Sequence, residues 1–369
     1  MIFYIAYTGF EVSESSGIWK KVMGQTRAFE KNLDQTYYTL LNCQMAYLMD
    51  GRRTVEKAAA VTRQEYLKIL IQWIEKYGVK KTYIRYPFAD KWFIELLRYQ
   101  KERGIQTVLE IASYPYDGEL SYGRLKVEDA YYRKMVSEYV ELITTYTHHE
   151  TIWGKPCITL VNGVDLEEVP LKKQRRQDGR LVLAAVSCMQ FWHAFDRMLE
   201  GMHQYYRAGG TKDIVFKLIG DGPDLNNYKK LAESFNLADH VVFCGRLKGE
   251  GLTRAYDEAD IAVGSLGIHR MGNSESAPIK GAEYCARGLP MVFGYTDTRF
   301  QGGIPFVLQV PADDTPISID KIIQFSEGLE ADHIDSMQIR DFAQKNLTWD
   351  AVMQPVVKYF KTNEIYTEK

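Results

Sequence analysis

The sequence predicts an α/β protein made of two open, largely parallel sheets that face each other across a cleft. Short apolar segments typical of buried strands alternate along most of the chain with longer segments of helical period, which is the pattern of parallel βαβ units. The chain has 369 residues, more than a single hydrophobic core usually serves, so two domains of about 150 to 200 residues are expected. Ligands of such sheets bind at the carboxyl ends of the strands.

In the first half of the chain, apolar runs predict five strands with amphipathic helices between them. The strands are expected at 2–6, 82–85, 107–111, 142–145 and 158–160, and the helices at 18–31, 63–77, 91–103 and 127–138. A strongly basic segment, LKKQRRQDGR at 171–180, then interrupts the alternation. It is interpreted as a solvated connector between domains, with contact to anionic lipid headgroups as the alternative.

The alternation restarts after this connector and predicts a second sheet. Strands are expected at 181–187, 214–219, 241–243, 261–265 and 291–293, and helices at 194–206, 225–235 and 252–258. A further helix is expected to begin near Pro278, because proline favours the first helical position. A last helix begins within LTWDAVMQPVVKYF at 347–360.

Composition narrows the class of protein and its compartment. The 46 basic and 48 acidic residues give a net charge of −2, which provides no overall field to attract nucleic acid. The five cysteines are widely spaced without a CxxC pair, which indicates reduced thiols in a cytoplasmic protein rather than disulfides or a zinc site. No run of 18 apolar residues predicts a membrane span, and the apolar N-terminus lacks the features of a signal peptide.

The segment GNSESAPIKGAEYCARGLPMV at 272–292 carries the clearest chemical signal. A helix starting near Pro278 places Glu275 in the loop ahead of it and Glu283 on its second turn, roughly 8 Å along the helix. Carboxylates accept hydrogen bonds from vicinal hydroxyls, and a helix N-terminus binds phosphate. This order fits the sugar, diphosphate and ribose of a nucleotide diphosphate sugar. The alternative is that both acids only favour the helix start.

Several ordered motifs carry a family resemblance. NGVD at 162–165, LIGDGPDL at 218–225, VVFCGRL at 241–247, AYDEADIAV at 255–263 and RGLPMV at 287–292 accompany the glutamate pair. In this order they resemble the retaining glycosyltransferases of family 4, whose GT-B fold has two Rossmann-like domains. In the first half, SGIWKKVMGQTRAFEK, YIRYPFADKW, EIASYPYDGEL and TYTHHETIWG are similar to bacterial members that build capsular polysaccharides or exopolysaccharides. The resemblance implies an acceptor-side domain of residues 1–165, completed by the C-terminal helix 349–369, and a donor-binding domain of residues 166–348.

The resemblance also implies roles for individual residues of the 272–292 segment. Glu275 would hold the hydroxyls of the transferred sugar, as one of two catalytic candidates, and Glu283 would hold the ribose. The backbone N–H groups of Ala277, Ile279 and Lys280 would face the diphosphate.

Other positions complete the implied donor site. Gly245 and Arg246 would line the nucleotide base. Gly17 would let the backbone approach a phosphate or the acceptor, with an ordinary turn at a helix start as the equal alternative.

The sequence departs from the family where the second domain begins. Members usually carry an arginine and a lysine after the first strand of this domain, whereas here Cys188 stands near the first position and His193 at the second. A neutral histidine donates a hydrogen bond but brings less charge than lysine. His193 remains the second catalytic candidate, with an ordinary packed histidine as the alternative, and Arg197 and Lys280 are candidates for supplying the missing charge.

The acceptor side is less specific. The histidine that the family often carries after the strand at 107–111 is absent, since Ala112 occupies about that place. Glu110, Tyr116 and Glu119 are the polar candidates nearby, on the acceptor side, for orienting the acceptor or the donor. Tyr116 and Glu119 fit equally well as residues that pack a loop.

The reaction implied is transfer of a hexose-type sugar from a nucleotide diphosphate sugar, a UDP-sugar in the first instance, to a saccharide with retention at the anomeric carbon. No metal or other cofactor is expected, because no DxD-like pair lies near the donor motif; ADD at 312–314 and EAD at 330–332 are interpreted as surface turns. The acceptor implied is a saccharide or a lipid-linked saccharide, with peripheral association at the inner face of the plasma membrane.

Two alternatives stay open. A sugar-nucleotide epimerase shares the two-domain architecture, although the ordered motifs fit it less well. A non-catalytic partner subunit would explain the loss of the usual arginine, lysine and histidine, whereas the glutamate pair argues against it.

Overall fold

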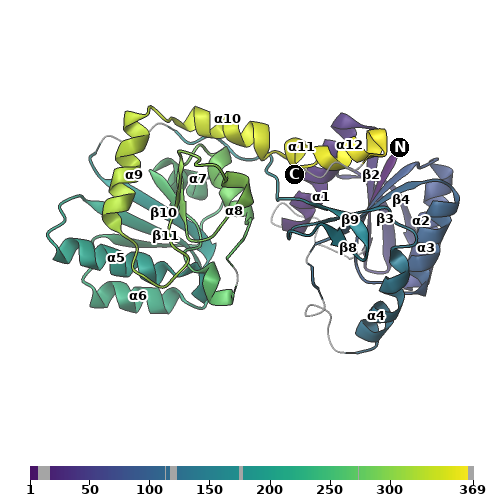
Figure 1. Cartoon of the computed structure of the whole chain (residues 1–369), viewed down its shortest axis with the longest axis horizontal. Coiled ribbons are helices and arrows are strands. Elements are labelled where there is room, and N and C mark those ends of the chain that lie inside the picture. Colours follow the sequence, from purple (N-terminus) through teal and green to yellow (C-terminus); the bar gives the residue numbers. More distant parts are fainter. Residues whose placement is uncertain (7–16, 113, 117–122, 174–177, 273, 365–369) are drawn as a thin grey trace. The chain divides into compact units, whose positions relative to one another are not determined.

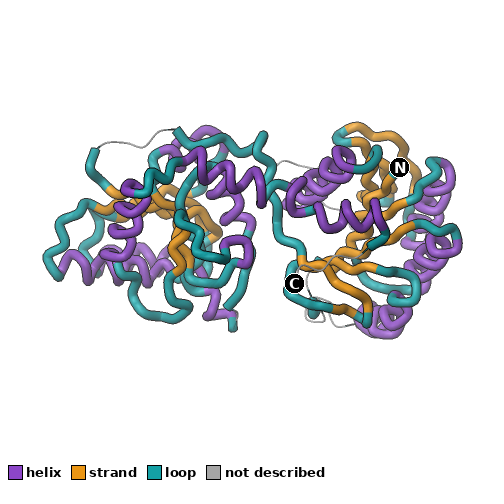
Figure 2. The backbone as a smooth tube through the Cα atoms, turned by 45° about the horizontal axis from the view of Figure 1, so that its top comes forward, coloured by secondary structure: helices purple, strands orange, loops and turns teal. Residues whose placement is uncertain are grey.

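The structure is a computed structural model, and it describes residues 1–6, 17–112, 114–116, 123–173, 178–272 and 274–364. The chain forms two compact units. Unit 1 consists of Met1–Gly163 with Trp349–Lys369, and unit 2 of Val164–Thr348. Each unit has a mainly parallel sheet flanked by helices (Figure 2), so the predicted α/β class with two sheet domains is confirmed.

The sheet of unit 1 has nine strands in the order β4-β3-β2-β1-β5-β6-β7-β9-β8. β1, β2, β5, β6, β7 and β9 run parallel, whereas β3, β4 and β8 pair antiparallel. The strands are β1 (Ile2–Ala6), β2 (Thr36–Asn42), β3 (Met45–Asp50), β4 (Arg53–Ala59), β5 (Lys81–Arg85), β6 (Gln106–Ile111), β7 (Leu142–Thr145), β8 (Thr151–Ile152) and β9 (Lys155–Thr159).

The sequence did not reveal the β2–β3–β4 meander. β4 is an edge strand with exposed polar side chains, so it lacks the apolar run of a buried strand. The turn between β2 and β3 uses Cys43 and Gln44 at φ of 48° and 59°. Neither residue type signals such a turn.

Helices pack on both faces of this sheet (Figure 1). α2 (Arg63–Lys76), α3 (Lys91–Glu102) and α4 (Arg124–Val136) share one buried core with the sheet. α1 (Gly17–Asn32), α11 (Trp349–Val352) and α12 (Gln354–Thr362) share the other. The chain therefore returns to unit 1 at its end, as two short helices where the sequence predicts one.

The indole of Trp349 packs directly against two glycines, Gly24 in α1 and Gly163 at the end of the first segment of unit 1. Neither position has space for a side chain. A Cβ atom added at Gly24 would lie 2.1 Å from Cδ1 of Trp349, and one at Gly163 would lie 2.7 Å from the same ring. We expect Gly24→Ala to lower the free energy of unfolding by about 1–3 kcal/mol, because α1 or the indole must move. Gly328→Ala is the matched control: it is helical too, and an added Cβ there meets nothing within 4 Å.

Urea unfolding of both variants gives the measurement. The control should gain up to about 1 kcal/mol from the helix propensity of alanine. An equal gain for Gly24→Ala would show that Trp349 has room to move away.

The sheet of unit 2 has six parallel strands in the order β12-β11-β10-β13-β14-β15. They are β10 (Leu181–Cys188), β11 (Ile214–Asp221), β12 (Val241–Gly245), β13 (Ile261–Val263), β14 (Met291–Phe293) and β15 (Val307–Gln309). The chain builds outward from β10 through β11 to β12, then crosses to β13 on the other side of β10. β10 and β13 therefore flank the topological switch point, where ligands of such sheets bind.

Two sets of helices cover this sheet. α5 (Phe195–Arg207), α6 (Leu225–Ser234) and α9 (Ile319–Ala331) share one core, while α7 (Gly249–Asp257), α8 (Ile279–Ala286) and α10 (Ser336–Asn346) share the other. β15, α9 and α10 were not predicted. Among the helices that the structure describes, none has both the length and the apolar character needed to cross a bilayer.

Candidate active site

A cavity of 270 Å³ opens at the switch point of unit 2, and we call it the switch-point pocket. It lies at the carboxyl ends of β10 and β13, beside the first turn of α8. Its walls include Ser187, Cys188, Trp192, His193, Ser265 and Lys280. Lys280 is the only lysine or arginine among the described residues that line it.

α8 begins at Ile279, near Pro278 as predicted, but Pro278 itself has an extended backbone with ψ of 149° and serves as the N-cap. The N–H groups of Ile279 and Lys280, the first two helical residues, have no acceptor within the helix. The N–H of Gly281 already donates to the carbonyl of Pro278 at 3.2 Å. Of the three N–H groups predicted to face the diphosphate, those of Ile279 and Lys280 therefore belong to the first turn of α8. That of Ala277 lies ahead of the helix.

Backbone hydrogen bonds fix the loop that carries Glu275. Glu275 forms an isolated parallel bridge with Thr296. The N–H of Ser276 donates to the carbonyl of Thr296 at 3.0 Å, and the N–H of Thr296 donates to the carbonyl of Ser274 at 2.8 Å. The side chain of Glu275 is exposed, so its carboxylate is presented from a loop held by main-chain bonds.

A buried ion pair holds the residue that precedes α8 in place. Arg299 and Asp297 pair at 2.6 Å with side chains that are 1% and 0% exposed. Arg299 also donates to the carbonyl of Pro278 at 2.7 Å. A Cβ at Gly281 would come within 3.0 Å of this guanidinium, so glycine leaves the room it needs. The sequence analysis missed this pair, because nothing near position 299 resembles a site motif.

Glu283 lies one turn into α8 and is half-buried. The ammonium of Lys280 lies 3.4 Å from its carboxylate. The cation at the pocket is therefore already associated with the carboxylate that is predicted to hold a ribose. A bound diphosphate would compete with Glu283 for Lys280.

His193 lies at the end of the short 3₁₀ helix η1 (Phe191–His193), directly after β10. Its Nδ1 accepts the N–H of Gln190 at 3.0 Å, so the ring proton is on Nε2. Burial lowers the pKa of His193, outweighing its contact with the Gln190 backbone. At neutral pH this ring is therefore a neutral hydrogen-bond donor at the edge of the pocket.

This protonation state predicts which replacements His193 tolerates. His193→Gln keeps a side-chain N–H, so we expect nucleotide binding to stay within about threefold of wild type, whereas His193→Leu should weaken it about tenfold. Calorimetric titration with UDP checks both values. Equal, large losses in the two variants would mean that the ring binds as a cation.

Arg197 does not line the pocket. Its guanidinium is buried and donates to the carbonyls of Thr315 at 2.8 Å, Pro311 at 3.1 Å and Leu266, and it pairs with Asp313 at 3.2 Å. The expectation that Arg197 neutralises a diphosphate is corrected accordingly. The residue ties a loop of unit 2 to the end of β13.

Arg270, which no sequence motif indicates, lies outside the pocket wall and contacts the segment that carries His193. It lies in η2 (Ile268–Met271), just ahead of the Glu275 loop. Its guanidinium forms a two-point contact with Asp196 at 3.0 and 2.7 Å and donates to the carbonyl of Phe191 at 3.1 Å. It therefore brackets the segment that carries His193.

The ADD segment proves to be part of this framework. Asp313 pairs with Arg197, and Asp314 accepts from Arg270 at 2.8 Å and lies 3.2 Å from His269. The segment lies in an exposed turn, as the sequence predicts, and its two carboxylates also hold neighbouring loops together. Across the described residues, no group of three or more His, Cys, Asp or Glu side chains could hold a metal ion.

Gly245 and Arg246 lie at the carboxyl end of β12, on the same edge of the sheet as the pocket but outside its walls. Gly245 has φ of 64°, a left-handed conformation that favours glycine. Arg246 lies 3.4 Å from the carboxylate of Asp221, at the end of β11. Their predicted contact with a base stays a prediction.

Ser187 is a further residue that sequence reasoning missed. Its hydroxyl lines the pocket, is buried and has no hydrogen-bond partner among the described residues. Buried hydroxyls are nearly always paired. Ser187 is therefore a polar group that can hydrogen-bond to a molecule in this pocket.

The structure gives the acceptor-side candidates different surroundings. Glu110 is fully buried at the end of β6. Tyr116 is 6% exposed and donates to Asp129 at 2.9 Å, which is the role of a packing residue. Gly17 is the first residue of α1, and an added Cβ there would meet nothing within 4 Å. Glu119 lies outside the described residues.

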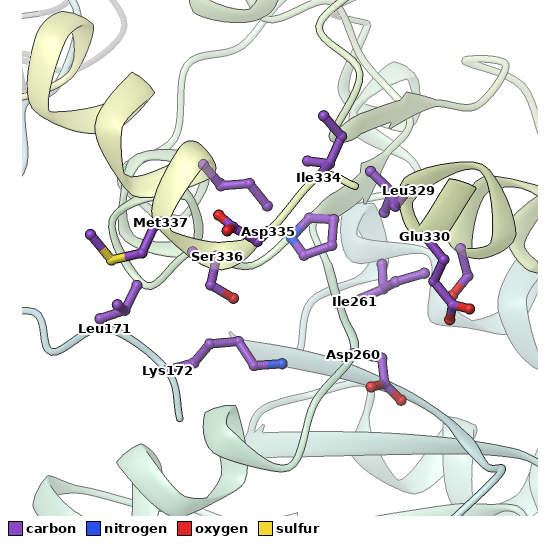
Figure 3. Close-up of a pocket in the computed structure, with 14 residues that line it drawn as sticks. Leu171, Lys172, Asp260, Ile261, Leu329, Glu330, Ile334, Asp335, Ser336 and Met337 are labelled. Atoms are coloured by element: carbon purple, nitrogen blue, oxygen red, sulfur yellow. The ribbon is translucent and has the colours of Figure 1, made fainter. Parts of the chain in front are cut away.

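A second cavity, of 410 Å³, lies at the opposite, amino-terminal edge of the unit 2 sheet (Figure 3). Three of its polar side chains are engaged within the protein: Lys172 donates to the carbonyl of Ala259, Asp260 accepts from Val182 at 2.8 Å, and Asp335 caps α10. We assign no function to this cavity.

Comparison with known proteins covers both the sequence and the fold. Residues 168–298 match the family described as Glycosyl transferases group 1. A comparison with curated proteins gives no match.

Similar solved structures span nearly the whole chain. HepE from Anabaena in complex with UDP has a TM-score of 0.61 at 10% identity over 98% of this chain and 99% of that one. A glycosyltransferase from Rickettsia africae has a TM-score of 0.62 at 11% identity over 98% and 99%. Sucrose-phosphate synthase from Thermosynechococcus elongatus has a TM-score of 0.56 at 14% identity over 98% of both chains. The fold is thus that of the GT-B glycosyltransferases, and together with the matched domain it supports a glycosyltransferase.

Proposed function

We propose that this protein is a retaining glycosyltransferase that moves a hexose-type sugar from a UDP-sugar to a saccharide or lipid-linked saccharide in surface polysaccharide synthesis. One observation carries the proposal: the switch-point pocket of unit 2 places a helix N-terminus, the cation of Lys280 and the N–H of His193 around one cavity. Such a cavity suits the diphosphate of a nucleotide sugar. HepE, a structural neighbour, is solved with UDP and with UDP-glucose.

The proposed roles follow from this arrangement. The N–H groups of Ile279 and Lys280 bind the diphosphate, Lys280 leaves Glu283 to neutralise it, and Glu283 then accepts the ribose hydroxyls. Glu275 accepts hydroxyls of the transferred sugar from its fixed loop. His193 donates a hydrogen bond to the same diphosphate.

The chemistry proposed is a front-face displacement. The bond between the anomeric carbon and the diphosphate oxygen breaks, negative charge grows on that oxygen, and the oxygen takes the proton of the attacking hydroxyl on the same face. Groups already placed around the diphosphate stabilise this charge without reorganising. In this proposal the diphosphate needs no metal ion.

The protein is cytoplasmic and meets a lipid-linked acceptor as a peripheral protein at the inner face of the plasma membrane.

A non-catalytic partner subunit is the second candidate, because Arg197 is held within the protein and Lys280 is the single lysine or arginine on the described pocket wall. Fewer cations would weaken stabilisation of the leaving group. Such a subunit would bind nucleotide without turnover.

The deciding experiment is nucleotide release from a panel of UDP-, GDP- and ADP-sugars, with Glu275→Ala as the comparison. Release from one sugar donor, lost in the variant, supports the transferase and identifies the donor. Binding of a nucleotide without release over a broad acceptor panel favours the partner subunit. The absence of both binding and release would overturn the transferase.

A further inference from the structure

Unit 1 has a switch point of its own. β1 connects to β2 on one side, while β5 pairs on the other side of β1. Arg85 is the last residue of β5, Glu110 lies at the end of the neighbouring β6, and Lys21 approaches from α1. These three charged groups form what we call the unit 1 charge cluster.

One carboxylate faces two cations in this cluster. The ammonium of Lys21 lies 3.2 Å, and a guanidinium nitrogen of Arg85 3.1 Å, from the same oxygen, Oε1 of Glu110. The other oxygen accepts from Gln25 at 2.8 Å and Tyr83 at 2.7 Å, with Tyr146 at 3.2 Å. Both oxygens of Glu110 are therefore occupied, and neither cation has a carboxylate to itself.

Among the described residues, the cluster carries an excess of one positive charge. Burial raises the pKa of the phenols of Tyr4, Tyr83 and Tyr146, so these neighbours stay neutral. Within the described residues, Glu110 is the one carboxylate that acts on Lys21 and Arg85. Burial, aided by the charge of Arg85, lowers the pKa of Lys21 to about 8 despite Glu110.

The cluster is largely, but not completely, shielded from solvent. The side chain of Lys21 is 10% exposed and that of Arg85 19% exposed, whereas Glu110 is inaccessible. Of these three side chains, only those of Lys21 and Arg85 are open to a ligand at this end of the sheet. Excess charge in a poorly solvated site is costly unless an opposite charge pairs with it.

We propose that Lys21 and Arg85 form a binding site for a singly charged oxyanion, a carboxylate or a phosphodiester, carried by the acceptor. One negative charge would neutralise the excess charge of the cluster. The guanidinium of Arg85 can donate two parallel hydrogen bonds to two oxygens of one carboxylate or phosphate group. Glu110, expected from the sequence to orient the acceptor directly, instead positions the two cations. That the ligand is the acceptor rests on the proposed function, whereas the anion site does not.

Chemical labelling of Lys21 tests the site without turnover. At pH 8 Lys21 is about half deprotonated because of its lowered pKa, so an amine-reactive ester should modify it, and peptide mass spectrometry gives the rate. The probes are methyl glucuronoside and dimethyl phosphate at about 10 mM, with saturating UDP present to occupy unit 2. Methyl glucoside is the neutral control, and sodium chloride controls for ionic strength.

We expect the glucuronoside, dimethyl phosphate or both to slow labelling of Lys21 several-fold, while exposed lysines such as Lys321 react as before. The anion that protects identifies the source of the charge, an acidic sugar or a phosphodiester. Arg85→Gln and the milder Arg85→Lys should lose the protection. Arg53→Gln, which removes an exposed arginine paired with Asp50, should keep it.

Equal rates with and without both anions, or equal protection by chloride, would overturn the anion site. Failure here leaves nucleotide release untouched, so it is distinct from failure of the proposed transferase. Protection of Lys21 together with transfer only to neutral acceptors would retain the anion site and refute its assignment to the acceptor.

Discussion

Glu110→Gln is expected to lower the free energy of unfolding of unit 1 by about 3–5 kcal/mol, because it leaves two buried cations without a counter-charge. Glutamine keeps the size of the side chain and part of its hydrogen bonding, so the loss reports on charge rather than on a cavity. Urea unfolding followed by circular dichroism gives the value. Adding Lys21→Met to this variant should recover part of the loss, since one unpaired cation is removed.

A matched control is Glu56→Gln in the same unit. Glu56 accepts from Lys76 at 2.5 Å, but Lys76 is 60% exposed. Exposed ion pairs of this kind contribute about 0–1 kcal/mol. If Glu110→Gln lowers the free energy of unfolding no more than Glu56→Gln does, solvent already screens the unit 1 charge cluster. The excess charge inferred there then has no effect on stability.

The same carboxylate predicts a pH dependence. Burial raises the pKa of Glu110, but the charges of Lys21 and Arg85, with hydrogen bonds from Gln25 and Tyr83, outweigh burial and lower the pKa to about 2 from the ordinary 4.5. Between these values the unfolded chain binds more protons than the folded one, so this contribution to stability is complete above about pH 4.5 and is lost as the pH falls toward 2. Unfolding of Glu110→Gln should therefore depend less on pH across this window than wild type.

Local sequence predicted those parts of the fold whose signal is contained in a few neighbouring residues. β1, β7 and β14 have the predicted bounds, because each is a short segment that is buried along its whole length. β4 escaped prediction because an edge strand needs no such run. α8 begins near Pro278 as predicted, although Pro278 is an extended N-cap and not the first helical residue.

The candidate site shows the same limit. The glutamates and the helix start are contiguous in sequence, so their arrangement could be foreseen. The groups that hold them in place could not, because Arg270 meets Asp196 from 74 positions away and Arg299 supports Pro278 from 21 positions away. Likewise, Arg197 has the right charge and location in sequence for a phosphate ligand, and only its contacts with distant carbonyls reveal its different role.

Glu275→Gln is expected to lower turnover with the nucleotide sugar by about 100-fold while the Kd for UDP changes by less than about threefold. The loop around Glu275 is fixed by the main-chain bonds of Ser276 and Thr296, which this substitution does not touch. What changes is the charge of an exposed carboxylate that, in the proposed function, accepts hydroxyls of the sugar, where positive charge grows in the transition state. A fixed charge that acts mainly in the transition state affects kcat rather than binding.

Glu250→Gln provides the control for this prediction. Glu250 is also exposed and lies in the first turn of α7, at the same carboxyl edge of the sheet but outside the switch-point pocket. Its replacement should leave both constants unchanged, which separates a general effect of surface charge from the position of Glu275. If Glu275→Gln instead weakens UDP binding as much as turnover, the carboxylate acts on the nucleotide itself, and the order of sugar, diphosphate and ribose along the pocket must be reversed.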